Sequence, residues 1–310
     1  MTPPAGRERS FRLVALGDSI TVGVGDTVGP DAVHGPGWAA HLATVLGAET
    51  FTNLATEGAR SRDVVGPQLD AALALRPHLA TVLVGGNDVL RSDFDPRHTL
   101  ADLHRSVDEL CRAGADVLLV LLPVIGLFEL GPRLVRRVMR RRVASINAAV
   151  EEVAASAPGR VVVVDAARAI APAGPRAWHI DRVHPSPTGH RALALAAAAA
   201  LSADPAAVGP APGFENGVMD ATASVTNTTP FSAAEARGQL PDAPEPPSVA
   251  ERLVWLLRAG LPWCVRRGRD FLPGLLRAVV HDLRAERALT PGVLRPRVSR
   301  PTRSAAAWRR

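Results

Sequence analysis

The sequence has little of what several classes of protein require. Only two of its 310 residues are cysteine. Cys111 and Cys264 lie far apart, so we expect no disulfide framework and predict that both are small buried side chains. The absence of any CxxC pair or Cys/His cluster argues against a zinc site. No apolar run approaches the roughly 18 residues of a membrane span, and the N-terminus lacks the apolar segment of a secretory signal. We therefore expect a soluble, cytoplasmic protein.

Two kinds of catalytic or nucleotide-binding motif are also absent. No G-x-S-x-G occurs, which argues against the strained nucleophile elbow of the α/β-hydrolases. The glycine-rich stretch GVGDTVG, residues 23–29, lacks the GK[ST] of a P-loop and the spacing of GxGxxG. We predict that this stretch is a flexible loop rather than a phosphate cradle.

Lysine is absent, so all 36 basic residues are arginine, and their distribution is uneven. Residues 1–250 hold 22 arginines against 26 acidic residues, whereas residues 251–310 hold 14 arginines against 4 acidic residues. The net positive charge therefore belongs to the C-terminal segment. A basic segment of this kind can bind anionic lipid, nucleic acid or an acidic partner.

Short apolar runs typical of strands alternate with longer segments of helical periodicity over residues 11–203. Three of these runs are continuously apolar, as parallel strands covered on both faces are. The alternation predicts a parallel sheet with helices on both faces. The expected strands are 12–16, 50–54, 80–85, 116–122 and 160–165, and the expected helices are 36–47, 61–76, 97–113, 132–156 and 188–203.

The composition changes after this α/β region. We expect a flexible N-terminus at 1–10, a folded domain at 11–204 and a linker rich in Pro, Gly, Ser and Thr at 205–248. Residues 249–287 are predicted to form an amphipathic helical extension and 288–310 a disordered basic tail. The apolar stripe of the extension favours packing on the domain or on a second subunit, and peripheral contact with an anionic membrane is the alternative. No nucleic acid partner is expected, because the arginines alternate with long apolar stretches.

Polar residues suited to acyl transfer follow several of the expected strands. Ser19 follows the first strand, Gly58 lies beyond the second, and Asn87 follows the third. Asp181 and His184 come after the fifth, beyond a loop. Ligands of an open parallel sheet bind beyond the carboxyl ends of its strands. A hydroxyl, a glycine N–H, a carboxamide, a carboxylate and an imidazole at one edge supply a nucleophile, a base, its orienting group and oxyanion donors.

These residues lie in GDS, NLATEG, GGND and DRVH, in that order along the chain. With these four blocks, residues 9–204 resemble the SGNH (GDSL) hydrolase superfamily. The resemblance implies a flavodoxin-like, three-layer α/β/α domain with five parallel strands in the order 2-1-3-4-5. It also implies catalysis by Ser19, Asp181 and His184, an oxyanion hole of Ser19, Gly58 and Asn87, and no metal or organic cofactor.

Each of these residues also has a structural interpretation. Ser19 or Asp18 could cap a helix, and Asn87 could cap a loop. Gly58 could serve a turn, although a missing Cβ would also let its N–H reach a substrate oxygen. The four ordered blocks favour the catalytic interpretation. Trp38, with the glycine-rich stretch, is expected to shape an acyl pocket beside Ser19.

The resemblance implies an esterase or lipase that cleaves a small-molecule or lipid ester. An acyltransferase or a carbohydrate deacetylase would use the same site, and the family's scaffold does not identify the ester. A non-catalytic lipid-binding protein on a hydrolase scaffold is the alternative from another class. The complete catalytic blocks argue against it.

Overall fold

The computed structural model describes residues 11–26, 34–91, 93–129, 131–203 and 238–255, together with residues 257, 258, 262, 273, 276, 277, 279–281 and 284. The expected N-terminal segment 1–10, most of the expected linker and the expected tail 288–310 lie outside the described residues, as does Cys264. In the described part of the chain, no helix has the length and apolar character needed to span a membrane.

Five parallel strands form one sheet in the order β2-β1-β3-β4-β5, which confirms the predicted topology. Each strand lies within two residues of its predicted bounds, because continuous apolar runs bounded by polar residues leave little choice of where a buried strand begins. The strands are β1 (Arg12–Gly17), β2 (Thr50–Asn53), β3 (Leu79–Leu83), β4 (Asp116–Leu121) and β5 (Val161–Asp165).

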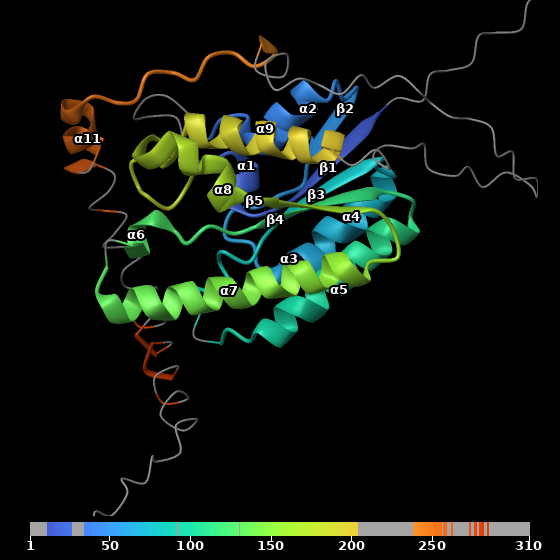
Figure 1. Cartoon of the computed structure of the whole chain (residues 1–310), viewed down its shortest axis with the longest axis horizontal. Helices are drawn as coiled ribbons and strands as arrows, with labels where there is room; N and C mark the ends of the chain where they lie inside the picture. Colours follow the sequence, from blue (N-terminus) through green and yellow to red (C-terminus); the bar gives the residue numbers. More distant parts are fainter. Residues whose placement is uncertain are drawn as a thin grey trace, which may run out of the picture.

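Helices cover both faces of the sheet and complete the three layers (Figure 1). On one face α2 (Gly37–Val45) packs against α9 (Pro187–Ala203), and α8 (Ala166–Ile170) lies beside α9. On the other face α5 (Pro96–Arg112) packs against α7 (Arg133–Ser156) and α4 (Leu69–Leu75). Two short helical segments, α6 (Gly126–Glu129) and η2 (Ala171–Ala177), complete the connections after β4 and β5.

The segment 61–76, predicted as one helix, is broken into three pieces. These are α3 (Ser61–Asp63), the π-helical turn η1 (Val64–Gln68) and α4. Gly66 has non-helical angles, φ −96° and ψ −113°, and Pro67 follows it. A proline removes a backbone donor and disfavours helical angles in the residue before it. The break turns Gln68 into the core, where only 4% of it is exposed.

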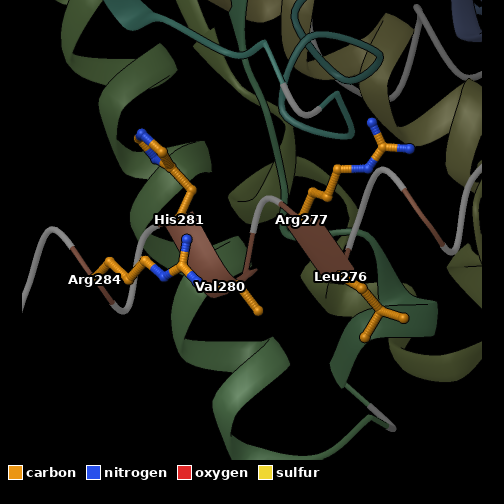
Figure 2. Close-up of a pocket in the computed structure, with 5 residues that line it drawn as sticks. All are labelled: Leu276, Arg277, Val280, His281 and Arg284. Carbon is orange, nitrogen blue, oxygen red and sulfur yellow. The ribbon is translucent and has the colours of Figure 1, made fainter.

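Part of the C-terminal extension is described. Residues 240–241 contact the domain: Leu240 packs against the core and the Pro241 carbonyl accepts a hydrogen bond from Arg191. Helix α11 (Val249–Trp255) follows. Further along, five residues line a pocket, with Leu276 and Val280 on one side of the segment and Arg277 and His281 on the other (Figure 2).

Candidate active site

The turn after β1 carries the candidate nucleophile. Gly17 has φ 146°, and a Cβ there would lie 2.2 Å from the carbonyl oxygen of Leu83, so only glycine lets β1 approach β3 this closely. Asp18 caps the next helix, α1 (Ser19–Val22), since its Oδ1 accepts from the Ile20 N–H at 3.0 Å. Asp18 is therefore structural, as predicted, and Ser19 is the first residue of α1.

Gln68 holds this turn from the other side. Its Oε1 accepts from the Gly17 N–H at 2.8 Å, and its Nε2 donates to the Gly17 carbonyl at 3.0 Å. A carboxamide has a donor and an acceptor in one plane, so it can pair with both backbone groups of one residue. The backbone immediately before Ser19 is thereby fixed by a side chain 51 residues further along the chain.

A hydrogen-bonded relay joins Ser19 to Asp181. Ser19 Oγ lies 2.9 Å from His184 Nε2, and His184 Nδ1 lies 2.8 Å from Asp181 Oδ2. The acceptor at Nδ1 fixes that nitrogen as the donor, so Nε2 is left to accept the serine proton. The structure thus brings together Ser19 and the Asp181/His184 pair, which lie in two blocks at opposite ends of the domain sequence.

The loop that carries Asp181 and His184 is closed by its own hydrogen bonds. Asp181 Oδ1 accepts from the backbone N–H of Val183 at 2.8 Å and of His184 at 3.0 Å. Arg182 adopts φ 53°, and its carbonyl accepts from the Leu127 N–H of α6 at 2.8 Å. The carboxylate and the imidazole are therefore oriented by backbone groups as well as by each other.

Ser19, Gly58 and Asn87 each have an N–H that could donate to an oxyanion in the predicted mechanism. Asn87 Nδ2 donates to the Ala59 carbonyl at 3.1 Å, which fixes the amide orientation and leaves its second N–H unused by that bond. Within the described part of the chain, the backbone N–H groups of Ser19 and Gly58 have no acceptor. Gly58 has φ 75°, and a Cβ there would meet nothing within 4 Å. Backbone conformation, rather than space, therefore requires glycine at this position.

Asp88 links the loop that carries Asn87 to the loop that carries Gly58. Its carboxylate accepts from the Ser61 N–H at 3.1 Å and from the Ser61 hydroxyl at 3.2 Å. Burial raises the pKa of Asp88, and the Ser61 hydrogen bonds offset this only in part. Because Ser61 lies just beyond Gly58 and Asp88 follows Asn87, this contact fixes the spacing between the two loops.

The pKa values of two carboxylates near Ser19 are shifted in opposite directions. Asp18 is buried next to Ser19, and desolvation raises its pKa to about 6 despite the hydrogen bond from Ile20. Burial alone would also raise the pKa of Asp181, but contacts with His179 and His184 outweigh it and hold that pKa well below its ordinary value. Asp181 is therefore ionised at neutral pH.

Trp38 does not lie where the sequence suggested. Its side chain has no exposed surface, its Nε1 lies 3.3 Å from Thr21 Oγ1, and its ring belongs to the apolar core. A ring with no exposed surface cannot line a pocket open to substrate. The prediction that Trp38 shapes an acyl pocket is therefore corrected: it supports α1 from within the core.

The described part of the glycine-rich stretch, residues 23–26, is held by hydrogen bonds rather than forming a flexible rim. His190 Nε2 donates to the Val24 carbonyl at 3.0 Å, while His190 Nδ1 accepts from the Trp38 N–H at 3.1 Å. Asp26 contacts His41 at 2.7 Å and Arg191 at 3.2 Å. Residues 27–33 lie outside the described part. Buried polar partners, invisible in a glycine-rich pattern, determine the order of this turn.

Sequence reasoning missed three residues that support the site and a fourth that makes a similar contact elsewhere in the domain. Gln68 contacts Gly17, and His179 contacts Asp181. Asn147 hydrogen-bonds both backbone groups of Leu122, as Gln68 does at Gly17. Arg142 is 3% exposed and donates to the carbonyls of Val89 and Arg91 just beyond Asn87. Only His179 carried a signal, its position two residues before Asp181.

No group of three or more His, Cys, Asp or Glu side chains in the described part of the chain could hold a metal ion. Cys111 is free and half-buried, packs against the core and has a pKa raised by burial.

Residues 15–192 match the GDSL-like lipase/acylhydrolase family. The chain belongs to this family. Membership makes the chain an ester hydrolase. A comparison with curated proteins finds no match.

Solved structures resemble this GDSL-family chain over its domain. LAE5, an α/β hydrolase enzyme from the metagenome of Lake Arreo, Spain, is 24% identical, with a TM-score of 0.50 over 61% of this chain and 94% of that one. The acetylxylan esterase Axe2 from Geobacillus stearothermophilus is 25% identical, with a TM-score of 0.47 over 60% of this chain and 91% of that one. At this identity the likeness to LAE5 concerns the fold alone.

Proposed function

We propose that this chain hydrolyses carboxylic esters through an acyl-enzyme on Ser19. The observation that carries the proposal is the relay of 2.9 Å and 2.8 Å from Ser19 Oγ through His184 to Asp181. These distances are within hydrogen-bond reach, as a nucleophile, its base and its orienting group require.

In the first half of the reaction, Ser19 Oγ attacks the ester carbonyl carbon and His184 Nε2 takes the hydroxyl proton. The tetrahedral intermediate collapses when the bond to the leaving alcohol breaks and His184 returns the proton to that alcohol. Water then attacks the acyl-enzyme by the same route, which releases the acid and restores Ser19. Asp181 stays ionised throughout and stabilises the imidazolium.

The negative charge on the carbonyl oxygen is stabilised by hydrogen-bond donors placed before substrate arrives. The N–H groups of Ser19 and Gly58 and the second N–H of Asn87 are these donors. They need no reorganisation at the moment of reaction, because the clamp at Gly17 and the Ser61–Asp88 contact already fix their loops.

The test is hydrolysis of p-nitrophenyl esters of increasing acyl length by the full chain and by its Ser19→Ala variant. We expect the variant to lose activity by several orders of magnitude, since only the oxyanion donors and binding remain. A fluorophosphonate should label Ser19 of the wild-type protein and leave the variant unlabelled. Thr21→Ser in the same helix is the matched control, because it keeps a hydroxyl without touching the nucleophile.

Activity that survives in Ser19→Ala, with labelling at another residue, would refute the proposal. If the wild-type protein labels but transfers its acyl group to added alcohols faster than to water, the same acyl-enzyme serves an acyltransferase. The dependence of activity on acyl length also tests whether the protein is a lipase, since a lipase prefers long acyl chains.

A further inference from the structure

Asp181 is shared by two histidines, of which the proposed mechanism uses one. Its Oδ2 lies 2.8 Å from His184 Nδ1 and 3.2 Å from His179 Nδ1. We propose that His179 is a positioning residue, which holds the Asp181 carboxylate in the orientation that His184 requires. This inference rests on the function proposed above.

The two oxygens of the carboxylate have separate tasks. Oδ1 accepts hydrogen bonds from the backbone N–H groups of Val183 and His184, and these bonds hold one end of the carboxylate. Oδ2 alone faces the imidazoles. The contact from His179 to Oδ2 opposes rotation of the carboxylate about its Cβ–Cγ bond, and such rotation would lengthen the bond to His184.

The contact from His179 is the longer of the two, and the 2.8 Å hydrogen bond to Oδ2 comes from His184. His179 also lowers the proton affinity of Asp181, together with His184. An ionised, immobile carboxylate is what an imidazole needs when it becomes positively charged during proton transfer. We therefore expect the side chain of His179 to affect the chemical step and not the binding of substrate.

The backbone of His179 has a structural task that a substitution of its side chain leaves intact. Its N–H donates to the His184 carbonyl at 2.9 Å, and its carbonyl accepts from the Arg182 N–H at 2.9 Å. The His179 side chain is 23% exposed, against 12% for Asp181. A side-chain substitution at this partly exposed position therefore removes the contact with Asp181 while the loop keeps its closing hydrogen bonds.

The test compares three variants of the full chain. His179→Ala removes the contact, and His179→Asn places an amide N–H close to the position of Nδ1. His179→Gln keeps size and polarity but carries its amide further from Asp181. We expect kcat on the best p-nitrophenyl ester to fall roughly tenfold in the Ala and Gln variants with KM unchanged, which corresponds to about 1.4 kcal/mol of transition-state stabilisation. In the Asn variant kcat should stay near wild type.

A double-mutant cycle separates positioning from a general effect on the loop. In an Asp181→Ala background, His179→Ala should cause no further loss, because its effect passes through that carboxylate. The rate of fluorophosphonate labelling of Ser19 should follow kcat across the set. An equal loss in both backgrounds, or equal activity of the Asn and Gln variants, would overturn the inference.

The outcomes for the two proposals differ. If the wild-type protein hydrolyses the esters and labels at Ser19 while all three His179 variants match it, only the role of His179 is refuted. If the wild-type protein neither hydrolyses nor labels, both proposals fail. The Asn and Gln variants keep the comparison valid if the Ala variant does not fold.

Discussion

The hydrolase domain and the C-terminal extension treat large apolar side chains in opposite ways. In the domain, Leu13, Leu16 and Trp38 have no exposed surface. In the extension, Leu257 is 65% exposed and Leu276 is 61% exposed. Of the eight large apolar side chains that are exposed in the described part of the chain, five lie between residues 253 and 280. The domain buries most of its large apolar side chains, whereas several of those in the extension remain exposed to solvent.

The extension is nevertheless not wholly separate from the domain. Val279 is 6% exposed and belongs to the domain's apolar core, while the neighbouring Val280 is 44% exposed. The stripe that the sequence predicts as one face is thus divided between two environments. We propose that the outer part meets an anionic membrane surface, because the same segment carries exposed Arg277 and Arg284, which complement anionic headgroups.

If the domain alone catalyses ester hydrolysis, a substitution in the site should lower kcat and a substitution in the extension should not. Asn87→Ala should lower kcat by roughly a hundredfold with little change in KM, because its N–H stabilises charge that develops only in the transition state. Leu276→Ser should leave kcat on a soluble ester unchanged. Steady-state kinetics on both variants measures this, and a rise in KM at constant kcat for Asn87→Ala would make Asn87 a substrate-binding residue instead.

Buried titratable groups of the domain should give it a pH dependence of stability. Asp18 has its pKa raised to about 6, so its carboxyl lowers stability as pH rises from 4 to 6. Burial lowers the pKa of His190 to about 4, so His190 raises stability over nearly the same range. The two opposing contributions should leave the wild-type protein with a shallow curve.

Asp18→Asn keeps an oxygen to cap α1 but removes one of the two contributions. The free energy of unfolding of this variant should rise from pH 4 to pH 6.5, gaining on the order of 3 kcal/mol relative to wild type. Urea denaturation at several pH values measures this. Parallel curves for the two proteins would show that Asp18 does not titrate in this range.

The two carboxamide clamps allow a comparison inside the domain. Gln68→Ala and Asn147→Ala each leave one backbone N–H and one carbonyl without their side-chain partner, so each should destabilise the fold by about 1–3 kcal/mol. Only Gln68→Ala should also lower kcat, because Gly17 precedes Ser19. Chemical denaturation and kinetics on the two variants test this, and an equal loss of kcat in both would mean that the clamps act through global stability.

The smallest expected effect concerns the extension. Each arginine near an anionic surface contributes about 1 kcal/mol, so Arg277→Ala should weaken binding to phosphatidylglycerol vesicles roughly fivefold. Arg97→Ala, on the exposed surface of the domain, is the matched control and should bind as wild type does. Flotation of the full chain measures both, and added salt should weaken the binding. If the wild-type protein does not float, the exposed apolar residues have another partner, such as a second copy of the chain.

The sequence predicted the sheet and the catalytic blocks better than the contacts that support them. Strand positions follow from apolar runs and polar boundaries, and the residues after strands such as β1 and β3 must meet at one edge. The break at Gly66 and Pro67 was readable in principle, because both residues oppose a helix. The helical periodicity of the surrounding leucines nevertheless led to the prediction of one continuous helix.

Contacts between distant segments are harder to predict. Nothing in the neighbourhood of Gln68 or Asn147 shows which backbone it will pair with, since the partner lies 51 residues away in one case and 25 in the other. Trp38 shows the same difficulty. It was predicted to line a pocket beside Ser19, but its ring is buried in the apolar core. Burial depends on which helix covers which strand, and one chain's periodicity does not specify that.

The distance along the chain between Ser19 and His184 also bears on how the protein folds. Their side chains meet across 165 residues, with strands β2 to β5 encoded between them. Contacts of this separation close large loops and form late compared with helices. Esterase activity should therefore be among the last properties to recover during refolding. The helical circular dichroism signal can recover first, whereas activity requires the first strand and the loop after the fifth strand to come together.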